Sequence, residues 1–246
     1  MTTGNTKLYQ SRKITNNLFA YIWQGRDNNC NSILFTDVLR NGHSHILIDP
    51  GHITNRLGED CFMELVRSME QDGYSAEDIG LVINTHSHPD HCEANSLVVE
   101  KSGADVVLSE EEELFRRGNS QKMFAFAGAA MTDFTPLFFL KDGNLDLGNS
   151  AKVSLDVFIT PGHSPGSVCL YWKEKKILIS GDVLFYGSIG RTDLPGGNHK
   201  ELKQSIDRLS GLDIEIIIPG HSTQYGSIIE GKQQIERNFQ IAKMYF

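Results

Sequence analysis

The feature that most constrains this chain is a run of histidine and aspartate residues directly after an apolar strand. Residues 81–83 are Leu-Val-Ile, which predicts a buried strand, and residues 85–91 continue as Thr-His-Ser-His-Pro-Asp-His. Pro89 stiffens the turn, so alternate side chains can point at different sites. Burying three imidazoles and a carboxylate without partners would be costly, so the motif indicates a metal site at the mouth of a sheet rather than a polar surface loop.

Three further apolar segments end in one common pattern. Residues 46–52, 157–163 and 216–221 each contain branched side chains and end in Pro-Gly-His. The Pro-Gly pair predicts a tight turn that presents the histidine just past the end of a strand. A fourth strand, over residues 177–179, delivers Asp182 in the same way. We therefore expect side chains that are distant in the sequence to converge on one rim.

The expected cluster suits two divalent cations. The predicted ligands of the first are His86, His88 and His163, and those of the second are Asp90, His91 and His221, with Asp182 bridging the two. Imidazole and carboxylate ligands without a thiolate favour Zn²⁺ and also permit Fe or Mn. The set leaves an open position for water, which is typical of a catalytic site. Taken singly, each residue outside the first motif could be an ordinary turn residue.

These motifs resemble those of the metallo-β-lactamase-fold hydrolases, and the match spans nearly the whole chain. The resemblance implies a four-layer αββα sandwich of the α/β class, with the metals at one edge between its two sheets. Residues 160–167, Thr-Pro-Gly-His-Ser-Pro-Gly-Ser, and the glycine-rich residues 180–197 look like the stand-alone, glyoxalase II-like bacterial hydrolases.

The chain departs from two branches of that superfamily. Classical glyoxalase II proteins carry a helical C-terminal domain that helps to hold glutathione, whereas only residues 222–246 follow the last histidine of the motif here. Asp182 stands where the best-known zinc β-lactamases have a cysteine. These departures disfavour β-lactams as substrates and leave the recognition of glutathione open.

The expected reaction is hydrolysis of a small thioester, such as a hydroxyacyl-glutathione, by a metal-bound hydroxide. We expect Asp90 to be catalytic: it would orient the nucleophile and shuttle its proton. A thiolate leaving group needs little protonation, which suits a site with few general acids. The alternatives are a lactonase or other ester hydrolase with the same two metals, a persulfide dioxygenase with one iron, and a non-catalytic metal-binding or partner-binding module.

Length and charge narrow the class of protein. The 246 residues contain no linker or low-complexity tract, so residues 1–246 are predicted to form a single domain. The 23 basic and 31 acidic side chains give a net charge of −8, which disfavours nucleic acid and anionic membranes as partners. No signal peptide, membrane span or Cys-x-x-Cys pair is evident. We expect a cytoplasmic protein with reduced thiols and a small-molecule substrate.

The remaining pattern predicts strands that alternate with helices in a layered α/β design. The expected strands cover 18–23, 32–35, 45–48, 105–108, 153–159, 168–172 and 214–218, and the expected helices 57–71, 94–101, 202–209 and 235–246. Ser109 and the four glutamates that follow predict a helix start with solvated carboxylates rather than a metal trap. The apolar residues 123–139 could form core packing, a lid or a homodimer contact.

Several polar residues have weaker expectations attached to them. His52 is predicted to line the cleft, and Arg191 is predicted to pair with Asp193. Tyr186 and Tyr225 are candidate donors to an oxyanion or a leaving group. The other histidines are expected at solvated loops or strand edges, namely His43, His45 and His199.

Overall fold

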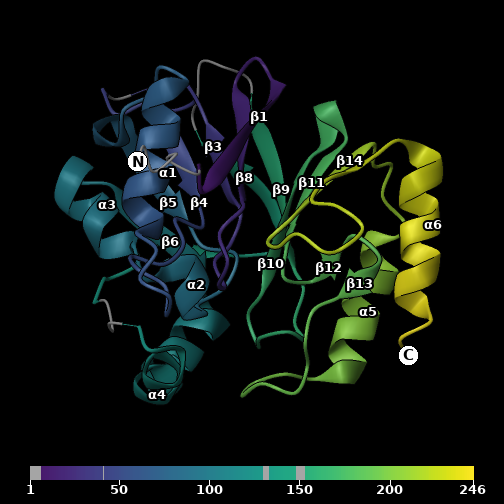
Figure 1. Ribbon diagram of the computed structural model, residues 1–246. Coiled ribbons are helices and arrows are strands. Elements are labelled where there is room, and N and C mark those ends of the chain that lie inside the picture. Colours follow the sequence, from purple (N-terminus) through teal and green to yellow (C-terminus); the bar gives the residue numbers. More distant parts are fainter. Residues whose placement is uncertain (1–6, 41, 130–132, 148–152) are drawn as a thin grey trace, which may run out of the picture.

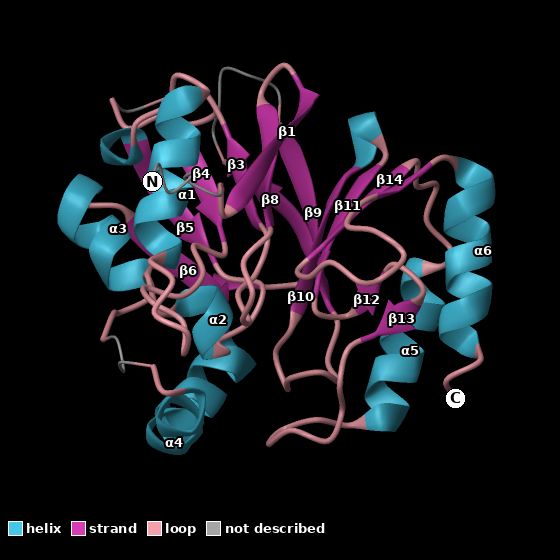
Figure 2. Cartoon of the chain, in the orientation of Figure 1, coloured by secondary structure: helices cyan, strands magenta, loops and turns pink. Residues whose placement is uncertain are grey.

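The computed structural model describes residues 7–40, 42–129, 133–147 and 153–246 of the chain. Two β-sheets lie in the middle, and helices cover their outer faces (Figure 1, Figure 2). The helices are α1 (Cys61–Gln71), α2 (Pro89–Cys92), α3 (Asn95–Ser102), α4 (Glu110–Ala127), α5 (His199–Leu209) and α6 (Lys232–Lys243). With α1 and α3 outside one sheet and α5 and α6 outside the other, the predicted αββα sandwich is confirmed.

The first sheet has seven strands that follow chain order. They are β1 (Tyr9–Thr15), β2 (Leu18–Trp23), β3 (Ser32–Phe35), β4 (His45–Ile48), β5 (Ile79–Ile83), β6 (Asp105–Ser109) and β7 (Phe139–Leu140). The pairs from β1 to β4 are antiparallel, whereas those from β4 to β7 are parallel. Because parallel strands run in one direction, β4 and β5 end at the same edge, which places the loops after Ile48 and Ile83 side by side.

The second sheet has six strands in the order β15-β14-β11-β10-β9-β8. Their bounds are β8 (Gly143–Asp146), β9 (Ser154–Ile159), β10 (Val168–Trp172), β11 (Ile177–Gly181), β14 (Ile216–Pro219) and β15 (Ile229–Glu230). A separate hairpin joins β12 (Leu184–Phe185) to β13 (Ser188–Ile189). Since β11 and β14 are parallel, the loops that carry Asp182 and His221 also leave the sheet at one edge.

The hydrophobic core lies in three layers that follow the alternation of side chains along each strand. In β4, Ile46 and Ile48 face the other sheet, whereas Leu47 faces α1 and α3. Between the sheets the ring of Phe35 packs against that of Trp172, with their centroids 5.5 Å apart. None of the helices in the described ranges combines the length and the apolar character that crossing a bilayer requires.

The helix predicted over residues 57–71 begins later than expected. Gly58 has a φ of +75°, which breaks the helical backbone, and the side chain of Asp60 accepts a hydrogen bond from the backbone N–H of Met63. The helix therefore starts at Cys61, and the side chain of Leu57 is exposed. The predicted start at Leu57 is wrong, because the spacing of apolar residues does not show the turn at Gly58.

The region from residue 109 onward confirms one expectation and corrects another. Ser109 caps α4 as predicted, and Glu110 and Glu111 are exposed. The prediction that all four carboxylates are solvated is wrong, since Glu112 and Glu113 are buried. Glu113 is neutralised there by ion pairs with two arginines, Arg116 and Arg117.

The apolar residues 123–139 include a part that is packed and a part that is exposed. Met123 and Phe124 pack against Cys92 and Phe115 in a small cluster, which is ordinary core packing. Residues 130–132 lie outside the described residues. Exposed apolar side chains occur at residues 137–139, so a homodimer contact there stays a prediction.

Candidate metal centre

Seven imidazole and carboxylate side chains meet at the edge where the strands of both sheets end. His86 and His88 lie on the loop after β5, and Asp90 and His91 lie on the short helix α2, which Pro89 begins. The second sheet supplies the other three, which follow β9, β11 and β14 and are His163, Asp182 and His221. Their donor atoms fall into three overlapping groups, and within each group the atoms lie within 4.8 Å of one another. The structure thus brings all seven predicted residues together.

The first group consists of three histidines, His86, His88 and His163. His88 Nδ1 lies 3.1 Å from His86 Nε2 and 2.9 Å from His163 Nε2. Burial and the neighbouring His163 lower the pKa of His88 to about 3, and burial together with His91 lowers the pKa of His86 well below its usual value. His86 and His88 are therefore neutral at pH 7, which is the form of imidazole that binds metal ions.

The second group contains Asp90, His91 and His221. His221 Nε2 lies 3.2 Å from His91 Nε2 and 3.3 Å from Asp90 Oδ2. Burial lowers the pKa of His221, but the carboxylates of Asp182 and Asp90 together outweigh burial, and the pKa rises to about 10. Burial likewise raises the pKa of Asp90, but the adjacent imidazoles hold it well below its usual range. The two carboxylates thus stabilise positive charge here, which a bound cation would supply in place of the protons on these imidazoles.

Asp182 lies between the two groups. Its Oδ2 is 3.5 Å from His163 Nε2 and 3.4 Å from His221 Nε2, so one carboxylate oxygen reaches histidines of both groups. Its Oδ1 is buried and has no hydrogen-bond partner among the described residues. The nearest cationic group to Oδ1 is His91 Nε2, at 3.3 Å. A buried carboxylate oxygen without a hydrogen bond is unusual in a folded protein, and a bound cation would satisfy it. The cluster therefore fits divalent metal ions.

Three of the histidines are held by an acceptor at Nδ1, so that Nε2 points into the cluster. His91 Nδ1 donates to Asp49 Oδ2 at 2.9 Å, and His163 Nδ1 lies 2.8 Å from the backbone oxygen of Arg191, which can only accept. His86 Nδ1 lies 3.1 Å from the hydroxyl of Thr85, whose proton goes to Asp49. Such partners fix the tautomer and the orientation of a ligating ring.

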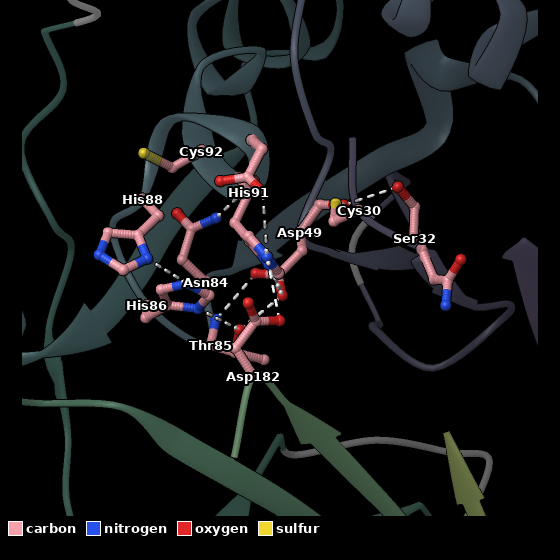
Figure 3. Close-up of polar contacts among 12 residues, drawn as sticks. Cys30, Ser32, Asp49, Asn84, Thr85, His86, His88, His91, Cys92 and Asp182 are labelled. Carbon is pink, nitrogen blue, oxygen red and sulfur yellow. Dashed lines mark hydrogen bonds and ion pairs between the residues drawn. The ribbon is translucent and has the colours of Figure 1, made fainter. Parts of the chain in front are cut away.

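Asp49 supports the cluster and was not predicted from the sequence. It is buried at the end of β4, where its carboxylate accepts hydrogen bonds from His91 and from both the backbone N–H and the hydroxyl of Thr85 (Figure 3). Its backbone is left-handed, with a φ of +51°, which an aspartate tolerates better than most residues. The Asp-Pro-Gly-His turn of residues 49–52 marks this position in the sequence, although its histidine, His52, was the residue predicted to line the cleft.

A family model described as the metallo-beta-lactamase superfamily matches residues 25–221. This chain belongs to that superfamily. Hydroxyacylglutathione hydrolase GloC of Haemophilus influenzae is 30% identical over 190 residues, which is 76% of this chain and 84% of that protein. The human acyl-coenzyme A thioesterase MBLAC2 is 28% identical over 233 residues, 85% of this chain and 77% of that protein.

Solved structures of the superfamily share the fold. The metallo-beta-lactamase family protein TTHA1429 of Thermus thermophilus superposes with a TM-score of 0.72 at 21% identity and covers 95% of this chain and 80% of its own. The protein TTHA1623, solved in a di-iron-bound form, gives a TM-score of 0.63 at 28% identity, with coverage of 82% and 93%.

The cluster opens onto a cavity of about 710 Å³. One wall is the later part of α4, which contributes Asn119, Lys122, Met123 and Ala127. Further lining comes from Phe185, Leu194, Pro195, Arg56 and Arg191. The guanidinium of Arg191 also pairs with Asp193 at 2.9 and 2.7 Å, which confirms that prediction.

Three weaker predictions about polar residues are wrong. His52 does not line this cavity; its Nδ1 lies 2.6 Å from the buried carboxylate of Glu93, because its turn packs against α2. Tyr186, which follows β12, and Tyr225, on the loop after β14, line a separate hollow of about 300 Å³ and not the cavity at the cluster. His45 is buried beside the ring of Tyr74 rather than solvated, and this burial lowers its pKa.

Proposed function

We propose that this chain is a metal-dependent hydrolase of small thioesters. The observation that carries the proposal is the pair of donor groups joined by Asp182 at one end of an open cavity. The ligands of the first ion would be His86, His88 and His163, and those of the second Asp90, His91 and His221, with Asp182 shared. When bound, two divalent ions would polarise a carbonyl oxygen and lower the pKa of water. Zn²⁺ suits this donor set, and Fe or Mn would also fit.

Asp90 is the residue of the cluster best placed to handle a proton. Its Oδ2 accepts a hydrogen bond of 2.6 Å from Asn28 Nδ2, and both residues line the cavity. The amide fixes the orientation of the carboxylate, and the low pKa keeps it ionised at pH 7. An ionised, oriented carboxylate can align an attacking water, accept its proton and return that proton to the leaving group.

The cavity supports a thioester as substrate. Apolar side chains of Met123, Phe185 and Leu194 can cover an acyl chain, and the cations Lys122 and Arg191 can attract an anionic carrier. Among the described residues that line it, no tyrosine is available as a general acid. A thiolate leaves without such help, whereas an alkoxide does not. The similarity to a hydroxyacylglutathione hydrolase supports the same choice.

The cell compartment that we propose is the cytoplasm. Among the described residues no disulfide is formed, and the four cysteines, Cys30, Cys61, Cys92 and Cys169, are thiols. Cysteines that stay as thiols are typical of a reducing compartment.

The test of this function combines metal analysis with a substrate panel. Protein purified without added metal should contain about two divalent ions per chain, as a dinuclear site requires. It should hydrolyse hydroxyacyl-glutathione or acyl-coenzyme A thioesters faster than lactones, and a chelator should abolish turnover until metal is restored. Faster hydrolysis of lactones would contradict the proposal that the substrate is a thioester. About one iron per chain, with oxygen uptake on a persulfide, would indicate a dioxygenase instead.

A further inference from the structure

A buried carboxylate in the first turn of α4 contacts two of the loops that carry the cluster. The side chain of Glu112 is fully buried. Its Oε1 accepts hydrogen bonds from the backbone N–H and the hydroxyl of Ser87, at 2.9 and 2.8 Å. Its Oε2 accepts from the hydroxyl of Ser164 and the backbone N–H of Gly166, at 2.8 and 2.9 Å. One carboxylate therefore joins the loop after β5 to the loop after β9.

These loops carry the whole first group of histidines. Ser87 lies between His86 and His88, and Ser164 directly follows His163. Among the described residues, the hydrogen bonds of Glu112 reach no residue of the second group, where Asn28 holds Asp90 and Asp49 holds His91. Asp49 also reaches His86 of the first group through Thr85, whereas the hydrogen bonds of Glu112 serve the first group alone.

The packing around Glu112 leaves little freedom for this contact to move. Ser109 Oγ accepts from the backbone N–H of Glu112 at 3.2 Å and donates to the backbone oxygen of Gly166 at 2.6 Å. A Cβ on Gly166 would lie 2.4 Å from the backbone nitrogen of Glu112, so only glycine fits there. The partial positive charge at the start of α4 also favours the carboxylate.

We propose that Glu112 is a positioning residue for the first metal ion. By holding both loops, it sets the distances among His86, His88 and His163 and links them to α4, whose later turns form a wall of the cavity. The inference rests on the metal binding in the proposed function but does not depend on the thioester substrate.

The test measures Zn²⁺ affinity by competition with a chromophoric chelator in two backgrounds. His221→Ala leaves the first group intact, and His163→Ala leaves the second group intact. Glu112→Gln replaces one acceptor oxygen with an N–H donor, so at least one loop loses its hydrogen bonds. The matched control is Glu113→Gln, since Glu113 is also buried in the same turn but pairs with arginines.

In the His221→Ala background, Glu112→Gln is expected to weaken Zn²⁺ binding about 10- to 100-fold, as removal of a group that orients ligands typically does. In the His163→Ala background, Glu112→Gln should change the affinity for Zn²⁺ by no more than about twofold, because substitutions at independent sites have additive effects. For the same reason, Glu113→Gln should change the affinity by no more than about twofold in either background. Equal losses in the two backgrounds, or none in either, would overturn the inference.

A milder variant covers the case in which Glu112→Gln does not fold. Ser164→Ala removes one of the hydrogen bonds to Glu112, and its smaller loss of affinity should again be confined to the first group. A loss of the same size in both backgrounds would contradict the role of Glu112. If the unsubstituted protein bound no Zn²⁺ in this assay, the proposed function itself would fail.

Discussion

At the scale of single residues, the charged carboxylate of Asp49 orients the imidazole of His91 toward the cluster. The carboxylate accepts from His91 Nδ1 and is itself held by Thr85. Asp49→Asn keeps the shape but removes the charge and one acceptor. We expect kcat/KM for the thioester and the affinity for the metal each to fall about 10- to 100-fold, as when other groups that orient ligating histidines are replaced. Metal content and steady-state kinetics would be measured on the same preparation.

A matched control for this variant is Asp37→Asn. Asp37 also has a left-handed backbone, with a φ of +57°, but it contacts Ser44 and His45 rather than the cluster. Its replacement should leave metal content and kinetics unchanged. If both variants lost metal equally, the effect of Asp49→Asn would reflect the backbone conformation and not the charge.

Lys122 belongs to the same scale, because it is an exposed cation on the wall of the cavity. Lys122→Gln should raise KM for a thioester with an anionic carrier about fivefold and leave kcat unchanged, since an exposed ion pair contributes up to about 1 kcal/mol. A neutral thioester serves as the control substrate and should show no change. A fall in kcat with KM unaltered would contradict this role.

At the scale of elements, the strands could be predicted well because their apolar runs are local signals. Residues 18–23, 32–35 and 45–48 form strands with the predicted bounds. Very short strands such as β7 and β12 carry no such signal, since two residues show no alternation. The start of α1 was misplaced because the conformation of Gly58 cannot be deduced from hydrophobic spacing.

The contribution of the N-cap of α1 to the stability of the fold can be measured at Asp60. Asp60→Ala removes the acceptor of the backbone N–H of Met63, and such a loss typically costs about 1 kcal/mol. The free energy of unfolding in urea should fall by that amount, while the metal content stays unchanged because α1 lies outside the sheets. Asp60→Asn keeps an acceptor and should restore most of the stability. A loss of metal in Asp60→Ala would show that α1 also shapes the cluster.

At the scale of the whole molecule, the position of the cluster followed from sequence, but its supports did not. Pro-Gly turns after apolar strands mark where histidines emerge, and parallel strands bring those ends to one edge. Asp49 and Glu112 act through partners that lie far away in the sequence, such as Ser164. No local pattern distinguishes a buried glutamate of this kind from its exposed neighbours Glu110 and Glu111.

The cluster also draws on both halves of the molecule, and this has a consequence for stability. The first sheet supplies four of the seven side chains and the second sheet supplies His163, Asp182 and His221, so bound metal would join the sheets. A ligand at 1,000 times its Kd stabilises the folded state by about 4 kcal/mol, which for a chain of this size raises Tm by roughly 10 °C. A chelator should therefore lower Tm by that amount, and calorimetry should show recovery with Zn²⁺. In His221→Ala, which keeps only the first group, the shift should be smaller. An unchanged Tm after verified removal of the metal would mean that the sheets hold together without it.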